Sequence, residues 1–380
     1  MVMRTILSIL KWLLIVILLA VVLAFATGNQ FLLKGVWATY LHGHKTASID
    51  DARFFQTRSV PAGQPQPWPL SPDLGRVQLT DDLRRTLENN RSVAFVIVQD
   101  GQLLYEEYWE DFGEASLTNS FSMAKSFTTM LAQCAIQDGL IQNWDQKVKD
   151  FLPELQGQYA EQVTLRHLTT MTAGMQFNEH YTNPFDITAK LYYGPNSYDL
   201  LMEESPIYRA PGTFEYQSGT TQLLGFVVMK ATGRRLSEYA SEKLWVPMGA
   251  EHAAEWHLDS RDGREHAFCC FNSNARDFAR YGQLMLRMGN WNGRQLLDTA
   301  FVEEAVRPHA VPQYGHSFWI IEDMDRQVYY MRGILGQYII VIPDLDLVVV
   351  RLGHEMGPKT GNHPEAVRVI VREVVGMVGG

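Results

Sequence analysis

The chain has 380 residues, and 46% of them are hydrophobic, so it can bury a sizeable core. This composition excludes a mainly disordered protein. The 42 Asp and Glu residues outnumber the 33 Lys and Arg residues, which gives a net charge of -9. Because the sequence also has no extended basic cluster, nucleic acid is not expected as a partner.

The N-terminal segment, residues 1–28, is typical of a membrane anchor or a signal peptide. Residues 5–25 are almost wholly apolar and follow Arg4, and a run of about twenty apolar residues has the length of a membrane-spanning helix. The basic N-terminal flank favours a cytoplasmic N-terminus, with the rest of the chain outside the cytoplasm. Residues 24–26, Ala-Phe-Ala, also fit a signal-peptide cleavage site. A retained anchor is favoured, and a secreted or periplasmic form after cleavage is the alternative.

The next segment, residues 29–74, is interpreted as linker and lead-in because it is rich in proline, and one domain is expected over residues 75–380. Thr80 is placed to cap the first helix of that domain. Residues 94–98 and 102–108 alternate apolar and polar side chains around an Asp-Gly pair, which predicts a β-hairpin.

A helix is predicted after residue 121, because Phe127, Met130, Leu131 and Cys134 recur with helical spacing. Ser122 falls in its first turn. The following region, up to about residue 310, is rich in helical periodicity and loop signals. Its clearest helical segments are residues 145–155, 163–172, 222–232 and 276–288.

Strand patterns return near the end of the chain, before a closing helix predicted over residues 364–378. Strands at both ends and helices between them predict an α+β fold, with an antiparallel sheet flanked by helices and a helical lobe inserted in the middle. The predicted late strands are residues 317–321, 328–331, 338–342 and 347–352.

The candidate catalytic motif is Ser-x-x-Lys at Ser122 and Lys125. Residues three apart lie on one face of a helix, so the lysine nitrogen can reach the serine hydroxyl. A serine hydroxyl is a weak nucleophile until a neighbour takes its proton, and the backbone N–H of Ser122 can help to bind an oxyanion. The spacing alone is weak evidence, because Ser8 and Lys11 repeat it inside the apolar N-terminal segment.

Around Ser122 the chain resembles the serine β-lactamase and penicillin-binding-protein family, within its branch of class C β-lactamases, esterases, DD-peptidases and 6-aminohexanoate-dimer hydrolases. The resemblance implies the β-lactamase/transpeptidase fold and hydrolysis of a small-molecule amide or ester through an acyl-enzyme, without a metal or an organic cofactor. The stretches that carry it are residues 121–127, 163–175, 211–219 and 223–225.

The family's second motif, Tyr-x-Asn or Tyr-x-Ser, has two candidates here. Tyr181 fits the literal Tyr-x-Asn pattern, whereas Tyr216 has the Pro-Gly-Thr-Phe lead-in and the Leu-Leu-Gly that follow in the family. Tyr216 is chosen as the residue that shares proton transfer with Lys125, and Ser218 is expected to hydrogen-bond Lys125 or the substrate. Tyr181 is then a loop residue and a candidate substrate contact.

The family's third motif, Lys-Thr-Gly or His-x-Gly, lies on a strand beside the nucleophile. The literal match at residues 359–361 comes too late in the chain, so its equivalent is expected at Met331, Arg332 and Gly333. Arg332 is the candidate cation, Gly333 allows substrate to approach the strand, and the N–H of Ile334 is the candidate second oxyanion donor. Met331 in place of the usual cation favours an esterase or amidase.

The three cysteines suggest no further chemistry. Cys134 lies in a helical pattern, Cys269 and Cys270 are adjacent, and no CxxC motif exists. Neither a disulfide framework nor a zinc site is therefore expected. Two alternative functions stay open: a cell-wall DD-carboxypeptidase or β-lactamase, and a catalytically silent penicillin-binding-like protein.

Overall fold

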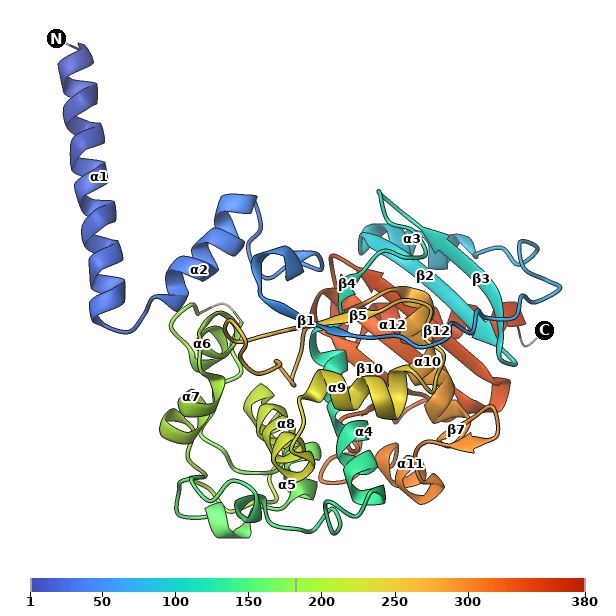
Figure 1. Ribbon diagram of the computed structural model, residues 1–380. Coiled ribbons are helices and arrows are strands. Elements are labelled where there is room, and N and C mark those ends of the chain that lie inside the picture. The colour runs from blue at the N-terminus through green and yellow to red at the C-terminus, as the bar shows by residue number, and fades with distance from the viewer. Residues whose placement is uncertain (1, 182, 379–380) are drawn as a thin grey trace.

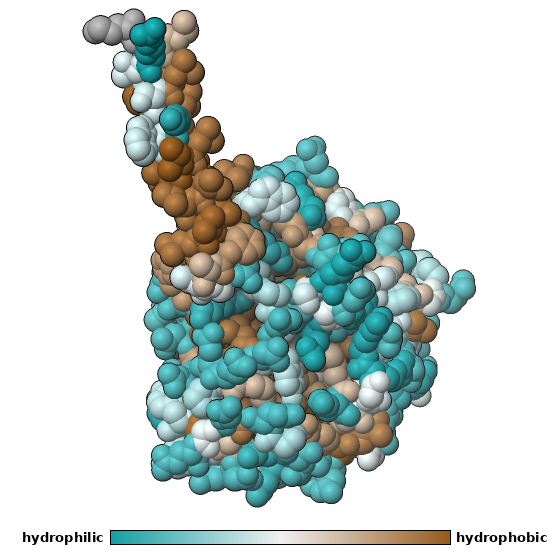
Figure 2. Space-filling model, turned by 60° about the vertical axis from the view of Figure 1, so that its left-hand side comes forward, coloured by the Kyte–Doolittle hydropathy of each residue, from teal (hydrophilic) through white to brown (hydrophobic). Residues whose placement is uncertain are grey.

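A long N-terminal helix stands apart from the body of the protein in the computed structural model, which describes residues 2–181 and 183–378 (Figures 1 and 2). This helix, α1 (Val2–Ala26), has a mean hydropathy of 3.0 in its most apolar window, and none of that window is buried in the body. Its length and composition fit a membrane span or a signal sequence.

The centre of the body is an antiparallel six-stranded sheet in the order β3-β2-β12-β11-β10-β9. The first two strands come from the predicted hairpin and the other four from the C-terminal region, so the sheet joins both ends of the domain as predicted. The strands are β2 (Ser92–Gln99), β3 (Gln102–Tyr108), β9 (Trp319–Ile320), β10 (Tyr329–Gly333), β11 (Gln337–Ile342) and β12 (Leu347–Gly353).

Side chains alternate between the two faces of this sheet along each strand, and both faces are covered by other parts of the chain. Val96 and Val98 of β2 point into the larger core, on the side of α10 (Ala275–Leu286). Phe95 and Ile97 point into a second core with side chains of α3 (Asp81–Asn89) and α12 (Glu365–Val378). The closing helix and the Thr80 cap, whose hydroxyl accepts from the Leu83 N–H at 3.2 Å, are thereby confirmed.

The remaining helices form a lobe beside the sheet (Figure 1). Its centre is α4 (Ala124–Gln137) packed against α8 (Ser218–Thr232). The predictions over residues 222–232 and 276–288 are confirmed by α8 and α10. Around them lie α5 (Leu165–Thr169), α6 (Ile187–Tyr193), α7 (Ser197–Glu204), α9 (Leu236–Ala240) and α11 (Thr299–Ala305).

Two predicted helices are wrong or much too long. Residues 145–155 contain only a 3₁₀ turn, Val148–Asp150, and residues 163–172 contain only the five-residue α5. The two segments bond to each other instead: the N–H of Val148 donates to Val163, and that of Leu165 donates to Gln146. This pairing uses backbone groups that a continuous helix would need.

Residues 29–74 are folded onto the domain, whereas the sequence suggested a linker. Their strand β1 (Thr57–Val60) joins a second antiparallel sheet, and Ile49, Phe55 and Trp68 are buried in the larger core. This packing could not be predicted, because the buried apolar residues of the segment follow neither a helical nor a strand spacing. The rest of that sheet is β5 (Ala254–His257), β6 (Phe271–Ser273) and β4 (Thr118–Asn119). The lead-in also contains the helix α2 (Phe31–Ala38). Two short hairpins lie later in the chain: β7–β8 (Asn290–Trp291, Arg294–Gln295) and β13–β14 (Lys359–Thr360, His363–Pro364).

Candidate active site

Ser122 lies in a 3₁₀ turn, Phe121–Met123, immediately before the first residue of α4. The prediction that it occupies the first turn of this helix is therefore correct to within one short turn. Phe121 has a positive φ of 44° and donates its N–H to the Asn119 side chain at 2.8 Å, which fixes the bend before Ser122. Backbone N–H groups at the start of a helix have no acceptor within the helix, so this bend presents donors beside the Ser122 hydroxyl.

Lys125 is almost fully buried, with 1% of its surface exposed. Its Nζ donates to the Ser122 hydroxyl at 2.9 Å, to the Ser218 hydroxyl at 3.0 Å and to the carbonyl of Phe268 at 3.1 Å. These three acceptors match the three N–H bonds of an ammonium group. The structure thus brings Ser122, Lys125 and Ser218 together as the sequence predicted.

Glu179 extends this hydrogen-bond chain, and sequence reasoning missed it. The Ser218 hydroxyl donates to Oε1 of Glu179 at 2.6 Å, and the Ser218 N–H donates to Oε2 at 2.8 Å. Ser218 therefore accepts from Lys125 and donates to a carboxylate, so the lysine and the carboxylate communicate through one hydroxyl. The only signal in the sequence was the place of Glu179 two residues before Tyr181.

Tyr216 lies against Lys125, with the lysine Nζ 5.1 Å from the centre of the phenol ring. Tyr314 and Trp319 hold the ring on its other sides, at centre-to-centre distances of 6.0 and 5.6 Å. This contact places the phenol in the same cluster as the Ser122 hydroxyl. The second-motif tyrosine chosen from the sequence is therefore next to the lysine.

Tyr181 also reaches the site, by a different contact. About half of the side chain is exposed, but its hydroxyl donates to Oε1 of Glu179 at 2.5 Å. Burial of the phenol oxygen, with the neighbouring carboxylate, raises the pKa of Tyr181 well above its usual value. Tyr181 is thus kept as a neutral hydrogen-bond donor, which does not suit a general base. Residue 182, the middle of its Tyr-x-Asn pattern, lies outside the described residues.

The end of β10 packs against the bend that carries Ser122. A Cβ atom on Gly333 would lie 2.3 Å from the carbonyl oxygen of Ser120, so only glycine fits at this position. Ile334 follows directly. Arg332 stacks on Trp319, with its guanidinium carbon 3.3 Å from the ring centre, and donates to the carbonyl of Asn362 at 2.9 Å. The late Lys-Thr-Gly match is exposed and lies in the separate β13–β14 hairpin, whose second strand is buried.

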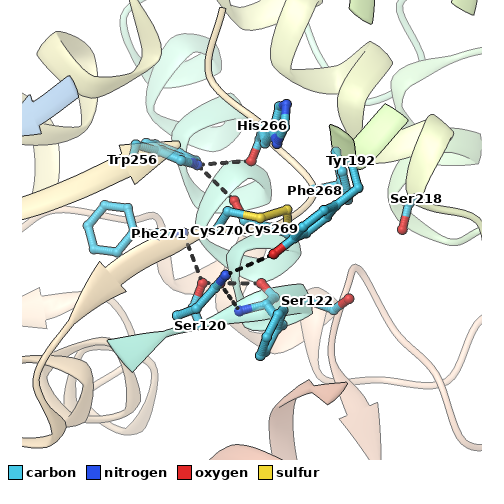
Figure 3. Close-up of a disulfide and its surroundings, with 12 residues drawn as sticks. Ser120, Ser122, Tyr192, Ser218, Trp256, His266, Phe268, Cys269, Cys270 and Phe271 are labelled. Atoms are coloured by element: carbon cyan, nitrogen blue, oxygen red, sulfur yellow. Dashed lines mark hydrogen bonds between the residues drawn. A yellow bond between two sulfur atoms is a disulfide. The ribbon is translucent and has the colours of Figure 1, made fainter. Parts of the chain in front are cut away.

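The segment of residues 266–271 contacts Lys125 through the Phe268 carbonyl. It contains a disulfide between Cys269 and Cys270 (Figure 3). No disulfide was expected from the sequence, because adjacent cysteines form no framework between distant segments. Both cysteines are buried. Phe268 directly precedes Cys269 in this loop, and its carbonyl accepts the hydrogen bond from Lys125 of α4. On the other side, the Phe271 carbonyl accepts from the Ser120 N–H at 3.0 Å.

His266, in the same loop, has its side chain close to both cysteine sulfurs. Burial lowers the pKa of His266 to about 4, and neither ring nitrogen has a hydrogen-bond partner among the described residues. Metal ions bind cysteine as the thiolate, and both sulfurs here are joined in the disulfide. In this state the cluster offers no thiolate ligand.

Comparisons with known proteins agree with the fold. The family model described as Beta-lactamase matches residues 80–371. A 6-aminohexanoate-dimer hydrolase of Paenarthrobacter ureafaciens is 25% identical over 73% of this chain and 76% of its own length. A solved structure of the 6-aminohexanoate-dimer hydrolase type from Bacillus anthracis has a TM-score of 0.73 and 23% identity, over 91% of this chain and 96% of that one.

A D-stereospecific amidohydrolase from a Streptomyces species shares the fold, with a TM-score of 0.59 and 16% identity over 78% of this chain and 98% of that chain. The family model spans most of the chain and includes every residue of the candidate site. The chain therefore belongs to the Beta-lactamase family of serine hydrolases.

Proposed function

We propose that Ser122 is the nucleophile of a hydrolase that cleaves a small amide or ester through an acyl-enzyme. The observation that carries the proposal is the 2.9 Å hydrogen bond between the buried Lys125 ammonium and the Ser122 hydroxyl. A nucleophile paired with a buried partner, which a third group holds in place, is the arrangement that activates a serine. Ser218 and the Phe268 carbonyl are the groups that hold Lys125 here.

In the proposed reaction, the Lys125–Tyr216 pair starts one proton short, as an ammonium with a phenolate or as an amine with a phenol. The Ser122 oxygen attacks the carbonyl carbon and its proton passes to this pair. The pair returns that proton to the departing alcohol or amine, which leaves the acyl group on Ser122. Water then adds to the acyl carbon, gives a proton to the same pair and releases the acid, while Ser122 regains its proton. The N–H groups of Ser122 and Ile334 are the proposed donors to the oxyanion.

The substrate class follows from the third motif and from the relatives. Met331 is buried and replaces the cation that would hold the carboxylate of a penicillin, while the Arg332 guanidinium stacks on Trp319. An amidase or esterase therefore fits better than a β-lactamase. The relative from Paenarthrobacter ureafaciens is named for an amide-linked dimer, which supports a small amide as substrate.

We also propose that α1 stays in the membrane and holds the domain outside the cytoplasm. Its 25 residues are long enough to span a bilayer, and its basic residues lie in its N-terminal half. A cleaved signal peptide would leave the same catalytic domain free of the membrane. Detection of the α1 peptide in membrane-bound protein by mass spectrometry would support the retained anchor.

The nucleophile is tested by intact-mass labelling of the full chain in detergent, with a fluorophosphonate and separately with a penicillin. A fluorophosphonate adduct that disappears in Ser122→Ala, with no penicillin adduct, is the expected result. Ser126→Ala is the matched control, because Ser126 is a buried serine one helical turn away, and it should still be labelled. A stable penicillin adduct would favour the cell-wall enzyme, and labelling that survives in Ser122→Ala would refute the nucleophile.

A further inference from the structure

The segment that follows α1 carries a largely exposed apolar face, of which only the Trp37 ring makes ring contacts among the described residues, with His42 and Phe54. Val36, Trp37, Tyr40 and Leu41, from α2 and the turn after it, are 46%, 47%, 63% and 71% exposed. The partly exposed Leu33 is spaced at i, i+3 and i+4 with Val36 and Trp37 along α2, and Tyr40 and Leu41 follow in the 3₁₀ turn Tyr40–His42. We call these five residues the outer face.

The opposite side of α2 is already used for packing against the body. Phe31 and Ala38 are buried, Lys34 lies 4.1 Å from the centre of the Phe55 ring, and Gly35 faces the ring of Tyr193 on α6. Helix α2 is thus fixed on the domain by one side while it presents apolar side chains on the other. A water-exposed helix ordinarily carries polar side chains on that second side, so the outer face requires an explanation.

The position of α1 indicates what covers this face. Only residues 27–30 separate the end of α1 from Phe31, and the N–H of Asn29 donates to Ala24 of α1 at 2.7 Å, which keeps this connection short. The apolar surface of α1 continues onto the body at this junction (Figure 2). If α1 spans the bilayer, α2 begins in the headgroup region, where tryptophan and tyrosine side chains concentrate in membrane proteins.

We propose that the outer face lies in the headgroup region of the bilayer and holds the catalytic domain against the membrane surface. This inference rests on the proposed membrane anchor. The outer face adds a second membrane contact, which fixes the orientation of the domain because α2 is packed on α6. The loop before α6 carries Glu179 and Tyr181, so the same orientation applies to the candidate site. An amphipathic segment binds a membrane surface through such an apolar face.

The proposal is tested with the photo-crosslinking residue p-benzoylphenylalanine in the full chain, reconstituted in vesicles of phosphatidylethanolamine and phosphatidylglycerol. Three single variants replace Leu41 on the outer face, Trp12 within α1, and Leu140, an exposed leucine just past the end of α4. All three side chains are exposed, so the substitutions do not disturb the core. Mass spectrometry after irradiation separates lipid adducts from protein–protein adducts.

A lipid adduct at position 41 at least about fivefold above that at position 140 is expected, together with a strong adduct at position 12. A strong adduct at position 12 with none at position 41 would overturn the docking face and leave the anchor intact. A dimeric protein adduct at position 41 would identify the face as an interface between two copies. Without a lipid adduct at position 12, the anchor and the docking face both fail.

Discussion

The hydrogen-bond partners of Lys125 form two groups, a helix side and a loop side, which come from very different parts of the chain. On the helix side its partner is Ser122, three residues earlier in the same turn. On the loop side its partners are Ser218, 93 residues away, and the carbonyl of Phe268, 143 residues away. The helix side holds the proposed nucleophile, whereas the loop side fixes where the lysine nitrogen lies. The comparison teaches that local spacing brings the proposed reactive pair together and that distant segments hold the lysine in position.

The largest effect is expected from removing the ammonium that joins the two sides. Lys125→Met keeps a long side chain in the buried site but removes every hydrogen bond to Ser122, Ser218 and Phe268. Because a positioned acid–base group contributes roughly 10²–10⁴-fold, kcat/KM for a p-nitrophenyl ester should fall by about that factor. Lys243→Met, at a lysine outside the site, is the matched control. Activity within about tenfold of the wild type would show that another group activates Ser122.

The next largest effect distinguishes the two tyrosines. Tyr216→Phe should lower kcat/KM by about 10²-fold, because the phenol next to Lys125 can no longer carry a proton. Tyr181→Phe should cost less than about tenfold, since it removes one hydrogen bond to Glu179 and no proton carrier. Rates measured with the same ester report both values. The reverse order would move the second motif from Tyr216 to Tyr181.

The sequence was informative wherever a function depends on local spacing. The four late strands were predicted from residue patterns, and Ser122, Lys125, Tyr216 and Ser218, which were singled out in the same way, lie together in the structure. Glu179 and the Phe268 carbonyl were missed for physical reasons. Glu179 and Ser218 are 39 positions apart in the sequence, with α6 and α7 between them, and a backbone carbonyl leaves no trace in the residue type.

The same distinction applies to the fold. The α8 and α10 helices carry long apolar patterns, and both were predicted close to their true ends. Residues 145–155 were predicted as a helix because their apolar spacing is compatible with one, but their backbone bonds to residues 163–165 instead. Such long-range pairing overrides a local propensity that amounts to under about 1 kcal/mol per residue.

Glu179 tests the loop side directly. Glu179→Gln keeps the shape of the side chain but removes the charge that accepts from Ser218 and Tyr181. Hydrogen bonds to a charged group are worth about 1.5–3 kcal/mol, so kcat/KM should fall by roughly 10- to 100-fold. Glu203→Gln, at an exposed glutamate on α7, is the matched control. An unchanged rate would restrict the role of Glu179 to structure.

The smallest effect is expected at the disulfide, which acts on the reaction only through the Phe268 carbonyl. Alkylation of the denatured chain should modify one cysteine before reduction, the free Cys134, and three after it. The double variant Cys269→Ser, Cys270→Ser releases the loop behind Lys125, so kcat should fall by about threefold to tenfold, the cost of weakening one hydrogen bond.

The KM should stay the same, because no atom of this loop is proposed to contact the substrate. Cys134→Ala, at a buried cysteine of α4, serves as the matched control and should leave kcat unchanged. A fall in kcat on reduction of the wild type, reversed on reoxidation and absent in the double variant, would show that the bond itself holds Lys125 in place. If the double variant keeps the full kcat, the carbonyl is held by the rest of the loop, through the Ala267 carbonyl that accepts from Thr128.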